Sequence, residues 1–249
     1  MYTFTIHVTY ITYFSFLFVK NNKFQLVPGR DEVLFDDEFS FNATTFYARN
    51  IHKHCAFIDL KKLKYAAMNT QSTEGYQREI HQTLLFVVIF YALSAALTSI
   101  KTRDAMAANI IEQCTWIFYT KAMFDLWNAE WYFDGPDELR IGVVQAYILL
   151  YILSQRNPSV GVGYVRQALV HALRVGLHKK DMYSSVNNKE CELRRVLWWL
   201  VYMCHIDEAD SSSIYVSDIS VDAPISQGEF AESARSLRKH LVAEGHIII

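Results

Sequence analysis

The fold is decided by residues 164–204, which read YVRQALVHALRVGLHKKDMYSSVNNKECELRRVLWWLVYMC. Two runs of apolar residues recur there at helical spacing: Val165, Ala168, Leu169, Ala172 and Leu173, and then Leu193, Val196, Leu197, Leu200, Val201 and Cys204. Such spacing places each run on one face of an α-helix. The stretch therefore predicts two amphipathic helices that pack as neighbours.

The residues between these two runs carry signals for helix ends. Gly176 stands where a left-handed residue would end the first helix, and Leu177 follows as the hydrophobic residue that accompanies this cap. Asn187 is suited to cap the second helix, with Glu190 three positions later as in a capping box. Glu190 also precedes Arg194 by four positions, which is the favourable order for an ion pair along a helix.

The composition of the 249 residues favours a packed helical chain. Apolar residues make up 51% and charged residues 20%, and the formal net charge is -2, which is unlike a disordered chain. Nine Gly and four Pro are few for a turn-rich β-sandwich. The near-neutral charge argues against a broad basic surface for DNA phosphates. We expect an all-α fold, a multi-helix bundle with an irregular N-terminal extension.

The N-terminal residues differ from the rest of the chain. Residues 1–19 contain no Asp, Glu, Lys or Arg, and their apolar and aromatic residues alternate with threonines. Lys20 and Lys23 follow this run instead of preceding it as in a secretory signal. A signal-anchor and an added strand or helix are alternatives to an extension outside the domain. Asp31–Glu38 holds five acids and no base, which indicates a solvated loop. We expect an extension over 1–45, a helical domain over 46–225 and a C-terminal helical segment over 226–249.

Two long apolar stretches predict helices over about 74–100, as one helix or a pair, and over about 104–127. Residues 83–100 contain no charged side chain and reach the lower limit for crossing about 30 Å of hydrocarbon. Thr83, Thr98 and Ser99 lie at the ends, and Ser94 interrupts the apolar run. A buried core helix is favoured. The alternative is a membrane-associated helical protein that uses residues 83–100 as a spanning segment.

The cysteines and histidines predict no metal site. Cys55, Cys114, Cys191 and Cys204 are scattered and form no C-x2-C pair, so buried thiols are favoured over a zinc site or a disulfide framework. His52, His54 and Cys55 cluster, but three ligands from four consecutive positions rarely converge on one ion. A polar turn is the favoured interpretation of that cluster.

The sequence also lacks the motifs of common enzymes. Gly161-Val162-Gly163 is followed by Arg166 where a nucleotide-binding loop needs its third glycine. Neither a G-x-S-x-G elbow nor an H-E-x-x-H helix is present. We therefore expect a protein that is not an enzyme, with no catalytic, cofactor-binding or metal-binding residues.

Aromatic residues gather on the second helix of the opening stretch. Trp198 and Trp199 are adjacent and point about 100° apart on a helix, so at most one of them lies centrally in the core. Core packing is the default interpretation of Trp198, Trp199 and Tyr202, and a ligand pocket or partner interface is the alternative. Residues 164–200 carry seven bases and three acids, which indicates a solvated face with ion pairs.

Three segments follow one another in an informative order: ALVHALRVGLH at 168–178, ELRRVLWW at 192–199 and VSDISVDAP at 216–224. Together they resemble the fungal-specific transcription factor domain, the helical middle homology region of fungal zinc-cluster regulators. The helix with Gln145 and Ala146 is also similar to that family. The resemblance covers residues 141–224 and extends back toward residue 46. It rests on the motif residues Gly176, Leu177, His178, Glu192, Arg194, Arg195, Asp218 and Pro224.

The resemblance implies a regulator of transcription that acts in the nucleus. Its partners would be proteins of the transcription machinery, a second copy in a homodimer, or a small-molecule effector, with no membrane favoured. The six-cysteine zinc cluster that reads DNA in this family is absent from the sequence. Zinc and DNA binding therefore apply at the level of the family only, and this chain is expected to act on DNA indirectly and without a cofactor. The expectation is a regulatory region without its DNA reader, as a fragment, a truncated product or a lineage that lost the cluster.

The sequence departs from the family pattern in three places, one of which is residues 211–215, where the usual Gly-Arg-Pro is replaced. Val196 occupies the position of the third arginine in the second motif, and His205-Ile206 replaces the usual Asp-Arg pair. We expect the three aromatic residues Trp198, Trp199 and Tyr202 to line a pocket or an interface through which this region responds to a ligand or a partner.

Overall fold

A computed structural model of the chain describes residues 37–53, 56–68, 76–101, 103–130, 137–154, 158–184, 186–207 and 221. Throughout this part of the chain the regular structure is helical, which confirms the expected all-α class. The α-helices are α2 (Asp37–Tyr47), α3 (Leu60–Met68), α4 (Tyr76–Ile100), α5 (Ala105–Glu130), α6 (Asp137–Leu153), α7 (Pro158–Val175) and α8 (Asn188–Asp207). A π-helical turn, η1 (Ala48–His52), extends α2, and a 3-10 turn, η2 (Lys180–Tyr183), lies between α7 and α8.

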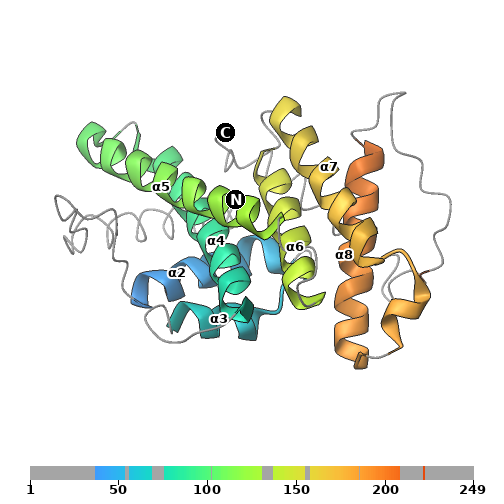
Figure 1. Cartoon of the computed structure of the whole chain (residues 1–249). Coiled ribbons are helices and arrows are strands. Elements are labelled where there is room, and N and C mark those ends of the chain that lie inside the picture. The colour runs from blue at the N-terminus through green and yellow to red at the C-terminus, as the bar shows by residue number, and fades with distance from the viewer. Residues whose placement is uncertain are drawn as a thin grey trace, which may run out of the picture.

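The helices pack in a series of neighbours, in the order α5, α4, α6, α7 and α8 (Figure 1). Helices α2 and α3 pack against each other and against α4. Helix α6 therefore lies between the half of the molecule built on α4 and the half built on α7 and α8. This arrangement explains why α6 is the most completely buried element.

Every residue from Ile141 to Ser154 in and just after α6 is buried. Its polar side chains find partners within the protein: Gln145 Nε2 donates to the carbonyl oxygen of Phe57 at 2.7 Å, and Ser154 Oγ donates to the carbonyl oxygen of Tyr151 at 3.0 Å. Buried polar groups are costly unless they are hydrogen-bonded. The contact from Gln145 also attaches the segment before α3 to the central helix.

Helices α4 and α5 form an antiparallel hairpin whose turn is readable in the sequence. The stretch expected as one helix or a pair of helices forms the single helix α4. Asp104 caps the N-terminus of α5, because its carboxylate Oδ1 accepts from the backbone N–H groups of Met106 (3.1 Å) and Ala107 (3.0 Å). Side chains join the two helices along their length, including Phe86 and Phe118 with ring centroids 5.7 Å apart.

Helix α4 contains the segment that raised the membrane alternative. Among the described residues, Ile80–Thr98 is long and apolar enough to cross a bilayer, and 83% of that window is buried inside the protein. A core helix surrounded by other helices passes the same length and composition test. The burial of α4 against α2, α3, α5 and α6 supports the core-helix interpretation.

The N-terminal boundary differs from the expected one. Helix α2 crosses the position between residues 45 and 46, and Ala43, Phe46 and Tyr47 are buried in the core. The acidic stretch expected as a loop ends inside α2, because Asp37 and Glu38 form its first turn, where acidic residues are favoured by the helix dipole. Among the described residues, helix therefore extends N-terminal to residue 46, as far as Asp37. Residues 1–36 and 226–249 lie outside the described residues.

Two glycines inside helices predict opposite effects of the same substitution. A Cβ at Gly142 of α6 would overlap Cγ1 of Ile80 on α4, whereas a Cβ at Gly163 of α7 meets nothing within 4 Å. We expect Gly142→Ala to lower the free energy of unfolding by about 1–3 kcal/mol, as overpacking does. We expect Gly163→Ala to raise it by about 0.5–1 kcal/mol through helix propensity. Urea unfolding of both variants measures this, and equal effects of the two would contradict the close contact of α4 and α6.

Candidate functional site

The candidate site is the junction of α7, η2 and α8, which holds most of the motif residues. Helix α7 ends at Gly176, whose φ is 80°. The N–H of Gly176 donates to the carbonyl oxygen of Leu173 at 3.0 Å, and the N–H of Leu177 donates to that of Ala172 at 3.0 Å. This pair of bonds is the Schellman motif, and Leu177 is fully buried beside it. The helix end expected at Gly176 is confirmed.

The turn after Gly176 is held by two further contacts. The hydroxyl of Tyr183 in η2 donates to the carbonyl oxygen of Leu177 at 2.6 Å. Burial raises the pKa of Tyr183 above its ordinary value, against the opposing charges of Arg194 and Arg195, so the phenol stays protonated and able to donate. The backbone N–H of Val221 donates to the carbonyl oxygen of His178 at 3.1 Å. Val221 belongs to the third motif segment, which is thereby joined to the first.

Helix α8 begins at the predicted cap. The side-chain Oδ1 of Asn187 accepts from the backbone N–H of Glu190 at 3.0 Å, as an N-cap residue does. The carboxylate of Glu190 turns along the helix toward Arg194, with 3.1 Å between Oε1 and Nε. The expected ion pair at four residues' separation is therefore present. Because the Glu190 carboxylate pairs with Arg194, it is not directed back to Asn187 as in a capping box.

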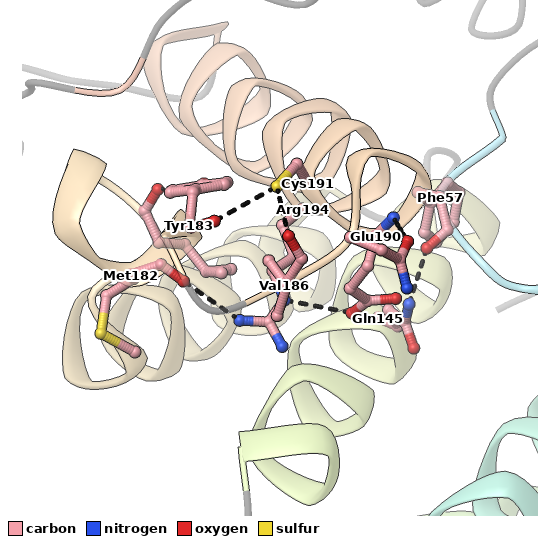
Figure 2. A network of polar contacts seen from close by, with 10 residues as sticks. Phe57, Gln145, Met182, Tyr183, Val186, Glu190, Cys191 and Arg194 are labelled. Atoms are coloured by element: carbon pink, nitrogen blue, oxygen red, sulfur yellow. Dashed lines mark hydrogen bonds and ion pairs between the residues drawn. The ribbon is translucent and has the colours of Figure 1, made fainter.

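Arg194 is the most buried charged side chain of the junction, with 5% of its side chain exposed. Besides Glu190, it reaches the 3-10 turn, where its Nη1 donates to the carbonyl oxygen of Met182 at 3.4 Å (Figure 2). The thiol of Cys191 lies in the same network, 3.4 Å from the carbonyl oxygen of Tyr183 and 3.5 Å from that of Val186. Arg194 and Cys191 thus attach α8 to the segment that connects it to α7.

Arg195 lies at the edge of this network. Its Nη1 is 3.5 Å from Oε2 of Glu192, and both side chains are about a quarter exposed. Its guanidinium also lies 5.8 Å from the centroid of the Tyr183 ring. The two neighbouring arginines of the motif therefore differ, since Arg194 is buried among backbone carbonyls and Arg195 covers an aromatic ring.

The aromatic residues of α8 form a row of touching rings. Trp198 is fully buried, with its ring 5.7 Å from that of Tyr202 in a stacked arrangement and 5.6 Å from that of His178. Trp199 is half-buried and meets Tyr202 edge-on at 5.8 Å. Trp198 is thus a core residue, and Trp199 and Tyr202 lie at the border of the core. The indole Nε1 of Trp198 is buried without a hydrogen-bond partner among the described residues.

A contact that the sequence did not predict attaches the start of α8 to the far side of the bundle. Lys189 Nζ lies 2.9 Å from Oδ2 of Asp59, whose Oδ1 accepts from the backbone N–H of Lys61 at 2.9 Å. Burial raises the pKa of Asp59, but these two contacts outweigh it and hold the pKa below its ordinary value. Asp59 and Lys189 are 130 positions apart, so no local pattern announces the pair.

Some residues singled out in the sequence are not among the described residues of this junction. Asp218 and Pro224 of the third motif lie outside the described residues, as do His54 and Cys55 of the histidine cluster. In the part of the chain that the structure describes, no three His, Cys, Asp or Glu side chains are placed to hold a metal ion. Gly161 and Gly163 lie within α7, one turn after its start.

The different surroundings of the two arginines predict different costs of removing them. Arg194→Ala leaves Glu190 and the Met182 carbonyl without their buried donor, and we expect a loss of about 2–3 kcal/mol in the free energy of unfolding. Arg195→Ala is the matched control and should cost about 1 kcal/mol or less, as exposed ion pairs and cation–π contacts do. Urea unfolding compares the two variants, and equal losses would show that Arg194 does not hold the junction together.

His52 predicts a pH dependence of stability. Burial lowers its pKa, which the Asp59 carboxylate opposes and Lys189 reinforces. The unfolded chain therefore binds a proton at a higher pH than the folded chain does, so the stabilising contribution is complete above the ordinary histidine pKa of about 6.5 and is lost as the pH falls through the lowered value. Replacing His52 with Gln should flatten the fall of stability below pH 6.5, as followed by urea unfolding between pH 7 and pH 5. If the free energy of unfolding of His52→Gln falls with pH as steeply as that of the wild type, His52 is not the cause of the fall.

Comparison with known proteins gives one match. The family model described as the fungal specific transcription factor domain matches residues 44–205. The matched segment runs from α2 into the last turn of α8 and includes the Gly176 turn, Arg194 and the aromatic row. No curated protein and no solved structure shows significant similarity to the chain.

Proposed function

The chain belongs to the fungal specific transcription factor domain family, whose model matches residues 44–205 of its 249 residues, and we propose that it is the helical regulatory region of a fungal zinc-cluster type transcription regulator. It acts in the nucleus and controls transcription through a partner or an effector and without catalysis. Zinc and direct DNA reading belong to the DNA-binding domain of the family, which has no counterpart in this sequence.

One observation beyond the family match supports this role, namely that the first two motif segments and Val221 of the third meet in space. The Gly176 turn, the arginines and tryptophans of α8, and Val221 converge at the α7–α8 junction through the bond from Val221 to His178 and the contact of the His178 and Trp198 rings. Residues of the first two motif segments and Val221 are therefore in contact at one junction. A ligand or a partner that binds at this junction would therefore act on both motif segments together.

The border of the aromatic row is where a ligand or a partner would act. Trp199 and Tyr202 are half-buried, and the Tyr202 ring stacks on that of the buried Trp198, whose indole N–H has no acceptor among the described residues. A small aromatic or apolar molecule that carries an acceptor would satisfy this donor if it displaced the Tyr202 ring. The same half-exposed rings suit an apolar anchor of a protein of the transcription machinery.

A reporter assay tests the regulatory role. The full chain is fused to a heterologous DNA-binding domain in yeast, and expression of a reporter with the matching sites is measured. Trp199→Ala and Tyr202→Ala should reduce the change in expression several-fold, whereas Tyr65→Ala, at an exposed position of α3, should leave it unchanged. Reporter expression equal to that of the DNA-binding domain alone would contradict the proposal.

A fluorescence titration tests the effector separately. Candidate metabolites are added to the purified chain, and the tryptophan emission is followed for the wild type and for Trp199→Phe. A saturable change that is lost or weakened in Trp199→Phe supports an effector site at the aromatic row. If no metabolite changes the emission and no protein partner binds in a pull-down, this row has no regulatory ligand.

A further inference from the structure

The outer face of α5 carries large aromatic side chains that the bundle does not cover. The exposed fractions are 56% for Trp116, 59% for Phe124 and 60% for Trp127. Helix α5 lies along the outside of the bundle, next to α4 (Figure 1). Tryptophan and phenylalanine at this exposure lose favourable burial, and such residues are typical of the anchors of protein interfaces.

These residues lie on one narrow stripe. At about 100° per residue, seven positions fall within about 40° on either side of Thr120, and they are Met106, Asn109, Gln113, Trp116, Thr120, Phe124 and Trp127. We name this set the α5 stripe. It contains no charged residue over about 32 Å of helix, at 1.5 Å per residue.

Two charged residues of α5 near the stripe, Lys121 and Asp125, point toward α4. Lys121 Nζ lies over the Phe86 ring of α4, 5.6 Å from its centroid, and the carboxylate of Asp125 accepts from Thr83 Oγ1 of α4 at 3.3 Å. Glu112 is exposed at the flank of the stripe. Two of these three charges therefore contact α4, and Glu112 is the charge that stays exposed beside the stripe.

The polar side chains of the stripe already have partners in their own helix. Thr120 Oγ1 donates to the carbonyl oxygen of Trp116 at 2.8 Å, and Gln113 Nε2 donates to Oδ1 of Asn109 at 2.7 Å. The Trp116 ring is also held edge-on against Tyr119 at 5.6 Å. Covering the stripe would thus remove few unsatisfied polar groups from water, and one of its anchors is already positioned.

We propose that the α5 stripe binds a second copy of the same chain, with the two α5 helices antiparallel about a two-fold axis at Thr120. In such a pair, a residue that precedes Thr120 meets the residue that follows it by the same number of positions. Trp116 then meets Phe124 of the other copy, and Gln113 meets Trp127. The small Thr120 lies at the crossing and allows the helices to approach each other.

Charge favours this occupant over a lipid surface. A face without charges brings no like charges together when it pairs with itself. A helix that lies on a membrane has Lys and Arg along its polar border, whereas the exposed border of the described part of α5 carries Glu112. The stripe is separate from the α7–α8 junction, so this inference does not depend on the proposed function.

Sedimentation velocity over a concentration series of the full chain tests the proposal. The wild type should form a dimer, and Trp116→Glu and Phe124→Glu should each weaken the association by about tenfold or more, as loss of an anchor does. Tyr65→Glu, at an exposed position of α3, is the control and should associate like the wild type. Circular dichroism confirms that the variants fold. A monomer at every concentration, or a dimer that neither substitution weakens, would overturn the proposal and leave the stripe to a different protein or to a membrane.

Cysteine cross-linking tests the two-fold axis. Thr120→Cys should form a disulfide-linked dimer under mild oxidation, because the two residues face each other on the axis. Asn109→Cys should not, because its two copies would lie about 33 Å apart along the helices at 1.5 Å per residue. The wild type reports the background from its own cysteines. Cross-linking of Asn109→Cys as readily as Thr120→Cys would show that the antiparallel arrangement is wrong.

Discussion

The burial of α6 on every side is the constraint on which the other helices depend. A helix enclosed in this way must be apolar around its whole circumference, and its few polar groups must find partners inside the protein. The sequence from Ile141 to Ser154 meets the first condition, and the bond from Gln145 to Phe57 meets part of the second. Gly142 then lets α4 approach closely, so the two halves of the bundle meet on one helix.

The α7–α8 junction is positioned by this central helix in two steps. Helix α7 packs directly on α6, where a Cβ at Gly161 would come within 2.9 Å of Ser154 Oγ. The left-handed residue Gly176 then reverses the chain, and Arg194 fixes α8 to the connecting turn. A buried charge held by one carboxylate and one carbonyl adds little net stability, but removing one of its partners is costly. Arg194 therefore specifies how α8 sits more than it strengthens the fold.

The sequence predicts features whose cause is local and misses those whose cause is distant. Gly176 and Asn187 were identified because helix ends depend on a few neighbouring residues. The start of α2 was missed because an acidic run suits both a loop and a first helical turn, and the burial of Phe46 decides between them. The pairing of Asp59 with Lys189 depends on packing between distant segments, which one sequence without its fold does not reveal.

The face of α5 and the core around α7 are in direct contact through two tyrosines. Tyr119, which holds the Trp116 ring, has its hydroxyl 2.6 Å from that of Tyr164 in α7. Burial raises the pKa of Tyr164, so its phenol stays protonated, and one of the two hydroxyls donates to the other. The ring centroid of Tyr164 lies 6.4 Å from that of Tyr147 of α6, and the Tyr147 ring stacks on the ring of His171 of α7. Contiguous packing of this kind is a physical route by which binding at the α5 face could affect the α7–α8 junction. Such coupling also requires an element with two arrangements. Helix α7 carries Tyr164 and His171 and ends at the Gly176 turn, so it connects the contact with Tyr119 of α5 to the α7–α8 junction.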